Sequence, residues 1–201
     1  MINKDNACKI EDYASCLRYN NNSYKFVLGL AILKIKEREE GNYIDFYKLA
    51  EEITEIYFRN IFKFNINENG KNKETRVEQI MKNYFTKYGY TSELTNTDKK
   101  NISKLIVENK KDGFFKYTLP CFDCAKKDDK GRYLYPDKGK NDFFYYDIDK
   151  EEIILTDDFL NLIKKEKKSL NRITIEKYEL FLKKRNENIK NIHEILKYYY
   201  L

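Results

Sequence analysis

One stretch of the chain, residues 24–39, limits the folds that are open to it. A surface helix keeps its apolar residues on one stripe, but here they would cover two faces: Phe26, Val27, Leu30 and Leu33 on one, and Leu28, Ala31, Ile32 and Ile35 on the other. Such a helix is stable only when other elements surround it, so we predict that it lies at the centre of the core. Ser23 precedes it and is the predicted N-cap, and Gly41-Asn42 ends it.

The remaining segments are predicted to form further helices and a small β element. Asp45 is expected to cap a helix that reaches about Phe62, followed by a polar loop over residues 65–73. The other predicted helices cover residues 74–88, about 98–109, from the Thr156 cap to about Lys168, and from near Asn171 to the C-terminus. The predicted strands are residues 114–119 and a hairpin of residues 143–146 and 153–155, with a short extended segment at Tyr43-Ile44.

These elements predict a mainly α fold with a small β-hairpin or sheet, of the α+β class. Two helices, a third basic helix and a later hairpin also suggest a winged-helix-like core. We expect residues 1–170 to form a mostly helical domain, with its β element at about 114–155. Residues 171–201 are expected to form a C-terminal basic helix that packs on this domain or extends from it.

The positive charge of the chain is concentrated near its C-terminus. The whole chain carries 39 Lys and Arg against 33 Asp and Glu, a net charge of +6. Residues 161–201 hold 11 basic and five acidic side chains, so this segment accounts for the whole excess. Such asymmetry is typical of a segment that faces a polyanion, although a solvated lysine-rich helix face would show it too.

Composition and motifs exclude several classes of protein. The chain has one histidine, His193, so chemistry that needs a histidine pair is excluded within it, and His193 itself is expected on a solvent-facing helix. It contains no phosphate-binding glycine loop and no nucleophile elbow. No apolar run is long enough to span a bilayer, and the first residues do not form a signal peptide, which predicts a cytoplasmic protein with no membrane partner.

Cys121 and Cys124 are the candidate metal ligands. Their CxxC spacing suits two thiolates on one zinc ion, but a closed structural site needs four ligands and no second pair follows. Two reduced thiols in a cytosolic protein would account for the pattern equally well. We therefore expect no cofactor, with zinc at these two cysteines as the one alternative.

Acidic residues between the predicted strands suggest one further alternative, an autonomous metal-dependent nuclease. Asp137, Asp147 and Asp149 are the carboxylates that would hold Mg²⁺. The chemistry of turns also explains acids at these positions without catalysis. We accordingly assign no catalytic residue and expect no enzyme activity from these 201 residues.

Nucleic-acid binding is the function that the composition favours. The candidate contacts are cations before and on the third helix and in the C-terminal segment: Lys25, Lys71, Lys73, Arg76, Lys82, Lys87, Lys164, Lys168 and Arg172.

Several segments together resemble one family. The segment Tyr19-Asn20-Asn21-Asn22-Ser23-Tyr24-Lys25, running into the apolar helix, resembles the opening of the N-terminal domains of bacterial HNH-endonuclease-like proteins. Matches in the same order follow at Phe46-Tyr47-Lys48-Leu49-Ala50-Glu51, Tyr117-Thr118-Leu119-Pro120-Cys121-Phe122, Phe143-Phe144-Tyr145-Tyr146 and Glu179-Leu180-Phe181-Leu182-Lys183-Lys184-Arg185-Asn186. In that family a catalytic HNH module follows the closing helix, and its histidine pair is missing here.

The resemblance implies a non-catalytic DNA-recognition or scaffold domain related to restriction and defence nucleases, with duplex DNA as its partner. The chain would then be the N-terminal part of a longer nuclease or a free-standing relative. The alternative is a small phage or defence protein that binds a nucleoprotein complex and regulates or inhibits it through protein contacts. The aromatic Tyr198-Tyr199-Tyr200-Leu201 end needs a covering surface, so it would pack on the domain, form a homodimer or continue into a longer chain.

Overall fold

The computed structural model describes residues 4–18, 22–69, 73–122 and 139–200, with side chains for those of residues 7–197 that lie in these ranges. Its α-helices are α1 (Lys4–Cys16), α2 (Tyr24–Arg38), α3 (Phe46–Tyr57), α4 (Arg76–Tyr88), α5 (Asn96–Glu108), α6 (Phe114–Thr118), α7 (Asp157–Lys183) and α8 (Ile192–Tyr200). A π-helical segment, η1 (Phe58–Lys63), follows α3, and a 3₁₀ segment, η2 (Lys110–Asp112), follows α5. The strands are β1 (Tyr43–Asp45), β2 (Phe144–Asp147) and β3 (Glu152–Leu155). The described residues thus confirm the predicted α+β class.

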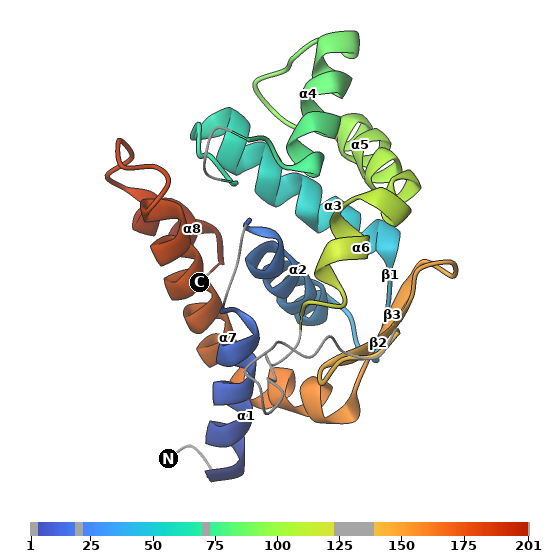
Figure 1. Cartoon of the computed structure of the whole chain (residues 1–201), viewed down its shortest axis with the longest axis vertical. Coiled ribbons are helices and arrows are strands. Elements are labelled where there is room, and N and C mark those ends of the chain that lie inside the picture. The colour runs from blue at the N-terminus through green and yellow to red at the C-terminus, as the bar shows by residue number, and fades with distance from the viewer. Residues whose placement is uncertain (1–3, 19–21, 70–72, 123–138, 201) are drawn as a thin grey trace, which may run out of the picture.

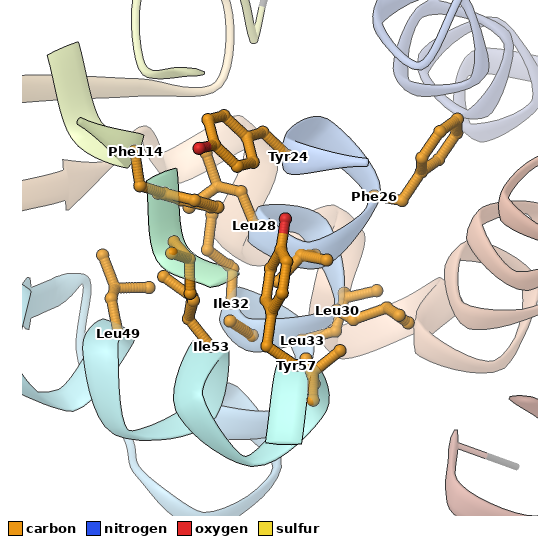
Figure 2. Packing of buried hydrophobic residues seen from close by; sticks show 14 of the residues in the cluster. Tyr24, Phe26, Leu28, Leu30, Ile32, Leu33, Leu49, Ile53, Tyr57 and Phe114 are labelled. Carbon is orange, nitrogen blue, oxygen red and sulfur yellow. The ribbon is translucent and has the colours of Figure 1, made fainter. Parts of the chain in front are cut away.

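Helix α2 lies at the centre of the core, as its apolar pattern predicts. Ten of its 15 residues are buried, and other helices surround it (Figure 1). Figure 2 shows Leu28 and Ile32 among side chains of α3 and α6, while Phe26 points away from them. On that other side Phe26 stacks on Tyr178 of α7, with ring centroids 5.2 Å apart. Burial on both sides explains why this helix has no polar face.

The three strands form one antiparallel sheet in the order β1-β3-β2. One face is buried and packs on the helices through Ile44, Phe144, Ile153 and Leu155. The sheet and α8 lie on opposite sides of the molecule (Figure 1). Along the chain, α2, β1, α3, α4 and the β2–β3 hairpin follow the order of the expected winged-helix-like core, with α5 and α6 as additions before the hairpin.

The residues at the start of α2 connect it to its neighbours. Ser23 stands at the N-cap position, but its side chain makes no capping bond, so that detail of the prediction is wrong. Its hydroxyl instead hydrogen-bonds to the Tyr57 hydroxyl at 2.8 Å, and the Asn22 side chain accepts from the Tyr24 amide. The Tyr24 hydroxyl in turn accepts from the backbone N–H of Arg76, the first residue of α4. The Ser-Tyr pair is therefore explained by the junction of α2, α3 and α4.

The predicted strand over residues 114–119 is wrong, because this segment forms α6. Phe114, Phe115, Thr118 and Leu119 are all buried. Their spacing places them on one side of a helix, whereas a strand would have exposed every second residue. Stacking of Phe115 on Phe46 of α3, at 4.1 Å, holds the short helix on the core.

The predicted break near Lys168 corresponds to a kink at Glu166. Helix α7 begins after the Thr156 cap, as predicted, and reaches Lys183, but the non-helical φ and ψ of Glu166 divide it into two helical parts. Leu170 and Thr174, in the second part, are fully buried. The predicted last helix, from near Asn171 to the C-terminus, is also divided, because α7 ends at Lys183 and α8 starts only at Ile192.

Candidate nucleic-acid interface

The cations predicted on α4 are mostly engaged by neighbouring side chains. Lys82 forms ion pairs with Glu74 at 2.8 Å and Glu78 at 2.9 Å. Arg76 donates to the side chains of Gln79 and Asn109, which ties α4 to the end of α5. These charges are therefore balanced or committed within the domain before any ligand arrives.

The other predicted cations near the first helices have mixed environments. Lys87 lies over the ring of the adjacent Tyr88, with its Nζ 5.0 Å from the centroid. Lys73 lines an open groove of about 970 Å³ between η1 and α4, together with the carboxylates of Glu74 and Glu78. Lys71 lies outside the described residues.

Lys25 has a structural position. Its Nζ donates to the backbone carbonyls of Cys16 at 2.9 Å and Arg18 at 3.3 Å. These carbonyls are at the C-terminal end of α1, where a cation is favoured by the helix dipole and by unpaired carbonyl groups. Lys25 therefore holds the segment that carries Arg18.

Two of the three predicted cations on α7 share one side of the helix. Lys164, Lys168 and Arg172 are all exposed. Lys168 and Arg172 are four residues apart in the part of α7 after the Glu166 kink, whereas Lys164 lies before the kink. Arg172 lies 3.9 Å from Glu176, an exposed contact that contributes little to stability. Lys168 and Arg172 thus form a short cationic stripe on the surface of α7.

A second group of cations meets where the end of α1 approaches α7 (Figure 1). An open concavity of about 330 Å³ is lined by Leu17, Arg18, Lys177, Leu180, Phe181, Lys184 and Arg185. We call it the α1–α7 basic concavity. Four of its lining residues are cationic, and none of those that the structure describes there is acidic.

Two contacts position the guanidinium of Arg185 in the α1–α7 basic concavity. It lies flat over the ring of Phe181, with its central carbon 3.6 Å from the ring centroid, and its Nη1 donates to the Phe181 carbonyl. Its Nε is buried and has no hydrogen-bond partner among the described residues. Partial burial lowers the pKa of this guanidinium, but arginine remains charged at neutral pH. The concavity thus contains a cation that is held in one orientation.

The cationic stripe and the α1–α7 basic concavity face different directions. Lys168 and Lys177 are nine residues apart, which is about two and a half helical turns. Their side chains therefore leave α7 on opposite sides, and the two groups cannot contact one flat ligand surface together.

The charge asymmetry of the sequence identified the right segment but not these residues. Lys177, Lys184 and Arg185 lie inside the basic stretch 161–201, yet none of them was predicted as a contact. Arg18 is more than 150 residues away and joins them only through the packing of α1 on α7. No local sequence signal marks that meeting.

The candidate metal ligands are not brought together within the described residues. Cys121 is an exposed free thiol, and Cys124 lies outside the described part of the chain. In the described ranges, no three His, Cys, Asp or Glu side chains are placed to hold one metal ion.

The acids of the nuclease alternative have local partners. The carboxylate of Asp147 accepts the backbone N–H groups of Asp149 and Lys150, which is turn chemistry. Asp149 itself forms an exposed ion pair with Lys111 at 2.7 Å. Asp137 lies outside the described residues.

His193 is exposed on α8 and contacts Glu179 of α7 at 2.5 Å. Burial would raise the pKa of Glu179, but hydrogen bonds from Lys183 and His193 hold it below its ordinary value. The one histidine of the chain therefore joins two helices and does not line the α1–α7 basic concavity.

No protein-family model, curated protein or solved structure matches this chain. The resemblance to HNH-endonuclease-like N-terminal domains consequently remains a prediction. Among the described helices, none is both long and apolar enough to cross a membrane.

Proposed function

We propose that this protein is a non-catalytic nucleic-acid-binding domain that contacts the phosphates of duplex DNA. The observation that supports this proposal is the α1–α7 basic concavity. Arg18, Lys177, Lys184 and Arg185 converge there without an acidic neighbour in the lining, whereas Lys82 of α4 is paired with two glutamates. Phosphate oxygens are the natural partners of such a group, because each contact also releases counterions from the DNA.

The chemistry of Arg185 suits phosphate oxygens. A guanidinium presents donors in a planar fork that matches two phosphate oxygens, and the ring of Phe181 keeps this fork in one plane. Lys177 and Lys184 are two helical turns apart and add positive charges that would contact phosphates along the DNA backbone. Such contacts do not distinguish one base from another. The proposed binding is therefore weakly specific for sequence.

Fluorescence anisotropy with a labelled duplex of about 20 base pairs tests the proposal. We expect the double charge reversal Lys177→Glu and Lys184→Glu to weaken binding at least tenfold and to reduce the slope of log K against log salt by about two. The matched control is Lys168→Glu with Arg172→Glu, which makes the same change of charge in the same part of α7 but away from the α1–α7 basic concavity. We expect less than a threefold effect from it.

Two results would contradict the proposal. A wild-type dissociation constant no better than millimolar at low salt would exclude nucleic-acid binding as the function. Equal losses in the two double variants would show that the affinity reflects net charge and that the α1–α7 basic concavity is no site. Circular dichroism of each variant confirms that the helices are retained.

A further inference from the structure

Leu180 is an exposed apolar side chain in the α1–α7 basic concavity. Its exposed fraction is 62%, whereas the other apolar residues of the lining, Leu17 and Phe181, are buried. A lone leucine on a charged surface is ordinary, but this one lies at the place where four cations converge. A leucine side chain gains free energy when it leaves water, and phosphate groups do not offer such an environment. Contacts to phosphates alone therefore leave this side chain unexplained.

Two lysines of α7 lie on either side of Leu180 along the helix. Lys177 precedes it by three residues and Lys184 follows it by four. Residues at these intervals are neighbours on a helix surface, so the three side chains leave α7 on the same side. The leucine is thus placed between two cations that line the same concavity.

The acids nearest to Leu180 along the helix contact other cations. Glu176 lies 3.9 Å from Arg172, Glu179 is paired with Lys183, and neither acid lines the concavity. The described lining offers cations and apolar groups, but no carboxamide, which would read adenine, and no carboxylate, which would read cytosine. Such a surface suits the readout of DNA shape better than the readout of base edges.

The spacing of the two lysines fits the minor groove of duplex DNA. Seven residues of helix rise about 10.5 Å, so Lys177 and Lys184 can reach phosphates on both edges of a groove that is about 6 Å wide. Leu180 then faces the floor of the groove. The helix itself is about 10–12 Å across, which is too wide for the undeformed groove. Contact of the leucine with the bases therefore requires the groove to open and the duplex to bend.

We propose that Leu180 enters the minor groove and kinks the bound duplex. The inference rests on the proposed function, because it assigns the deformation of the DNA to a residue of the same concavity. Lys177 and Lys184 hold the two phosphate edges, and the leucine side chain partly unstacks one base step, as apolar wedges do in minor-groove proteins. The preferred sites are pyrimidine–purine steps, because these unstack and kink most easily.

Two optical signals from one duplex test the inference. The duplex carries 2-aminopurine beside a central TA step, which reports unstacking, and a donor and an acceptor dye at its ends, which report bending. We expect the full chain to raise both the 2-aminopurine fluorescence and the energy transfer, and to bind this duplex about fivefold more tightly than one with a central A-tract. Leu180→Ala should abolish both optical changes and weaken binding to the TA duplex about threefold, whereas Leu180→Met should keep them.

Tyr88→Ala is the matched control, because this side chain on α4 is 63% exposed and does not line the concavity. It should leave the affinity and both optical signals unchanged. Binding that depends on Lys177 and Lys184 but raises neither signal would overturn this inference and leave the proposed function standing. Both signals retained in Leu180→Ala, or lost equally in Tyr88→Ala, would also contradict it. A wild-type chain that does not bind the duplex would overturn the inference and the proposed function together.

Discussion

Gly29 lies where α2 faces Tyr13 of α1. A Cβ at this position would be 2.7 Å from the Tyr13 hydroxyl and 3.6 Å from the Phe122 ring. Tyr13 is fully buried, and its hydroxyl hydrogen-bonds to Thr174 of α7 at 2.8 Å, so it cannot easily move away. The absence of a side chain at Gly29 thus permits contact between three helices.

We predict that Gly29→Ala destabilises the protein by about 1–3 kcal/mol through overpacking. In an exposed helix the same change would stabilise by about 1 kcal/mol. In a Tyr13→Phe background the clash with the hydroxyl is gone, so the cost of Gly29→Ala should fall below about 1 kcal/mol. Urea unfolding of the four proteins in this cycle measures the coupling, and additive effects would contradict the explanation.

Glu68 is a carboxyl group inside the protein. It is fully buried, and its oxygens accept from Tyr178 at 2.6 Å and from Asn60 at 2.8 Å. Burial raises the pKa of Glu68, although hydrogen bonds from Tyr178, Ser23 and Asn60 act in the opposite direction. Because its folded-state pKa is above the unfolded value, the group favours folding most when it is protonated. This contribution is complete below the unfolded pKa and is lost as the pH rises through the folded pKa.

We predict that Glu68→Gln removes this pH dependence. The amide side chain of the variant would keep an acceptor for Tyr178 without the cost of burying a charge. The unfolding free energy of the wild type, minus that of the variant, should therefore fall from acid pH toward pH 8. Urea titrations across this range give the difference at each pH, and a constant difference would show that Glu68 does not titrate differently in the two states.

At the scale of elements, the cap of α7 connects the helix to the sheet. The Thr156 hydroxyl accepts the Phe159 amide at 3.3 Å and donates to the Phe143 carbonyl, next to β2. Asp157 and Asp158 follow in the first turn, where negative charge is favoured by the helix dipole.

We predict that Thr156→Ala destabilises the protein by about 1–2 kcal/mol. Thr86→Ala is the matched control, because that hydroxyl is exposed on α4 and only hydrogen-bonds to the Lys82 carbonyl of its own helix. Its effect should be within about 0.5 kcal/mol. Thermal and urea unfolding compare the two, and equal losses would mean that the cap has no special role.

At the scale of the whole molecule, α7 forms part of the core on both sides of residue 170. Beyond it, Ile175, Tyr178 and Leu182 are buried. They pack in part against α1 and α2, and Tyr178 stacks on Phe26 at the centre of the molecule. The C-terminal segment is therefore a structural component of the domain as well as the carrier of its positive charge.

We predict that a fragment of residues 1–170 does not fold. Loss of these aromatic and aliphatic contacts costs several kcal/mol, a large part of the stability of a domain this size. Near-ultraviolet circular dichroism and hydrogen exchange should show no fixed tertiary packing in the fragment. A cooperative unfolding transition in residues 1–170 would instead support a domain boundary at this point.

The sequence alone determined four features: the central place of α2, the capping by Asp45 and Thr156, the hairpin, and the concentration of charge in residues 161–201. Each depends on neighbouring residues, through helical or strand periodicity, capping hydrogen bonds or a simple count of charges. Tertiary structure decided the rest, because it depends on residues far apart in the chain. It replaced the cap at Ser23 by a bond to Tyr57 and placed Arg18 beside Lys177. It also paired Asp45, Glu152 and Asp147 across three strands, which no single strand reveals.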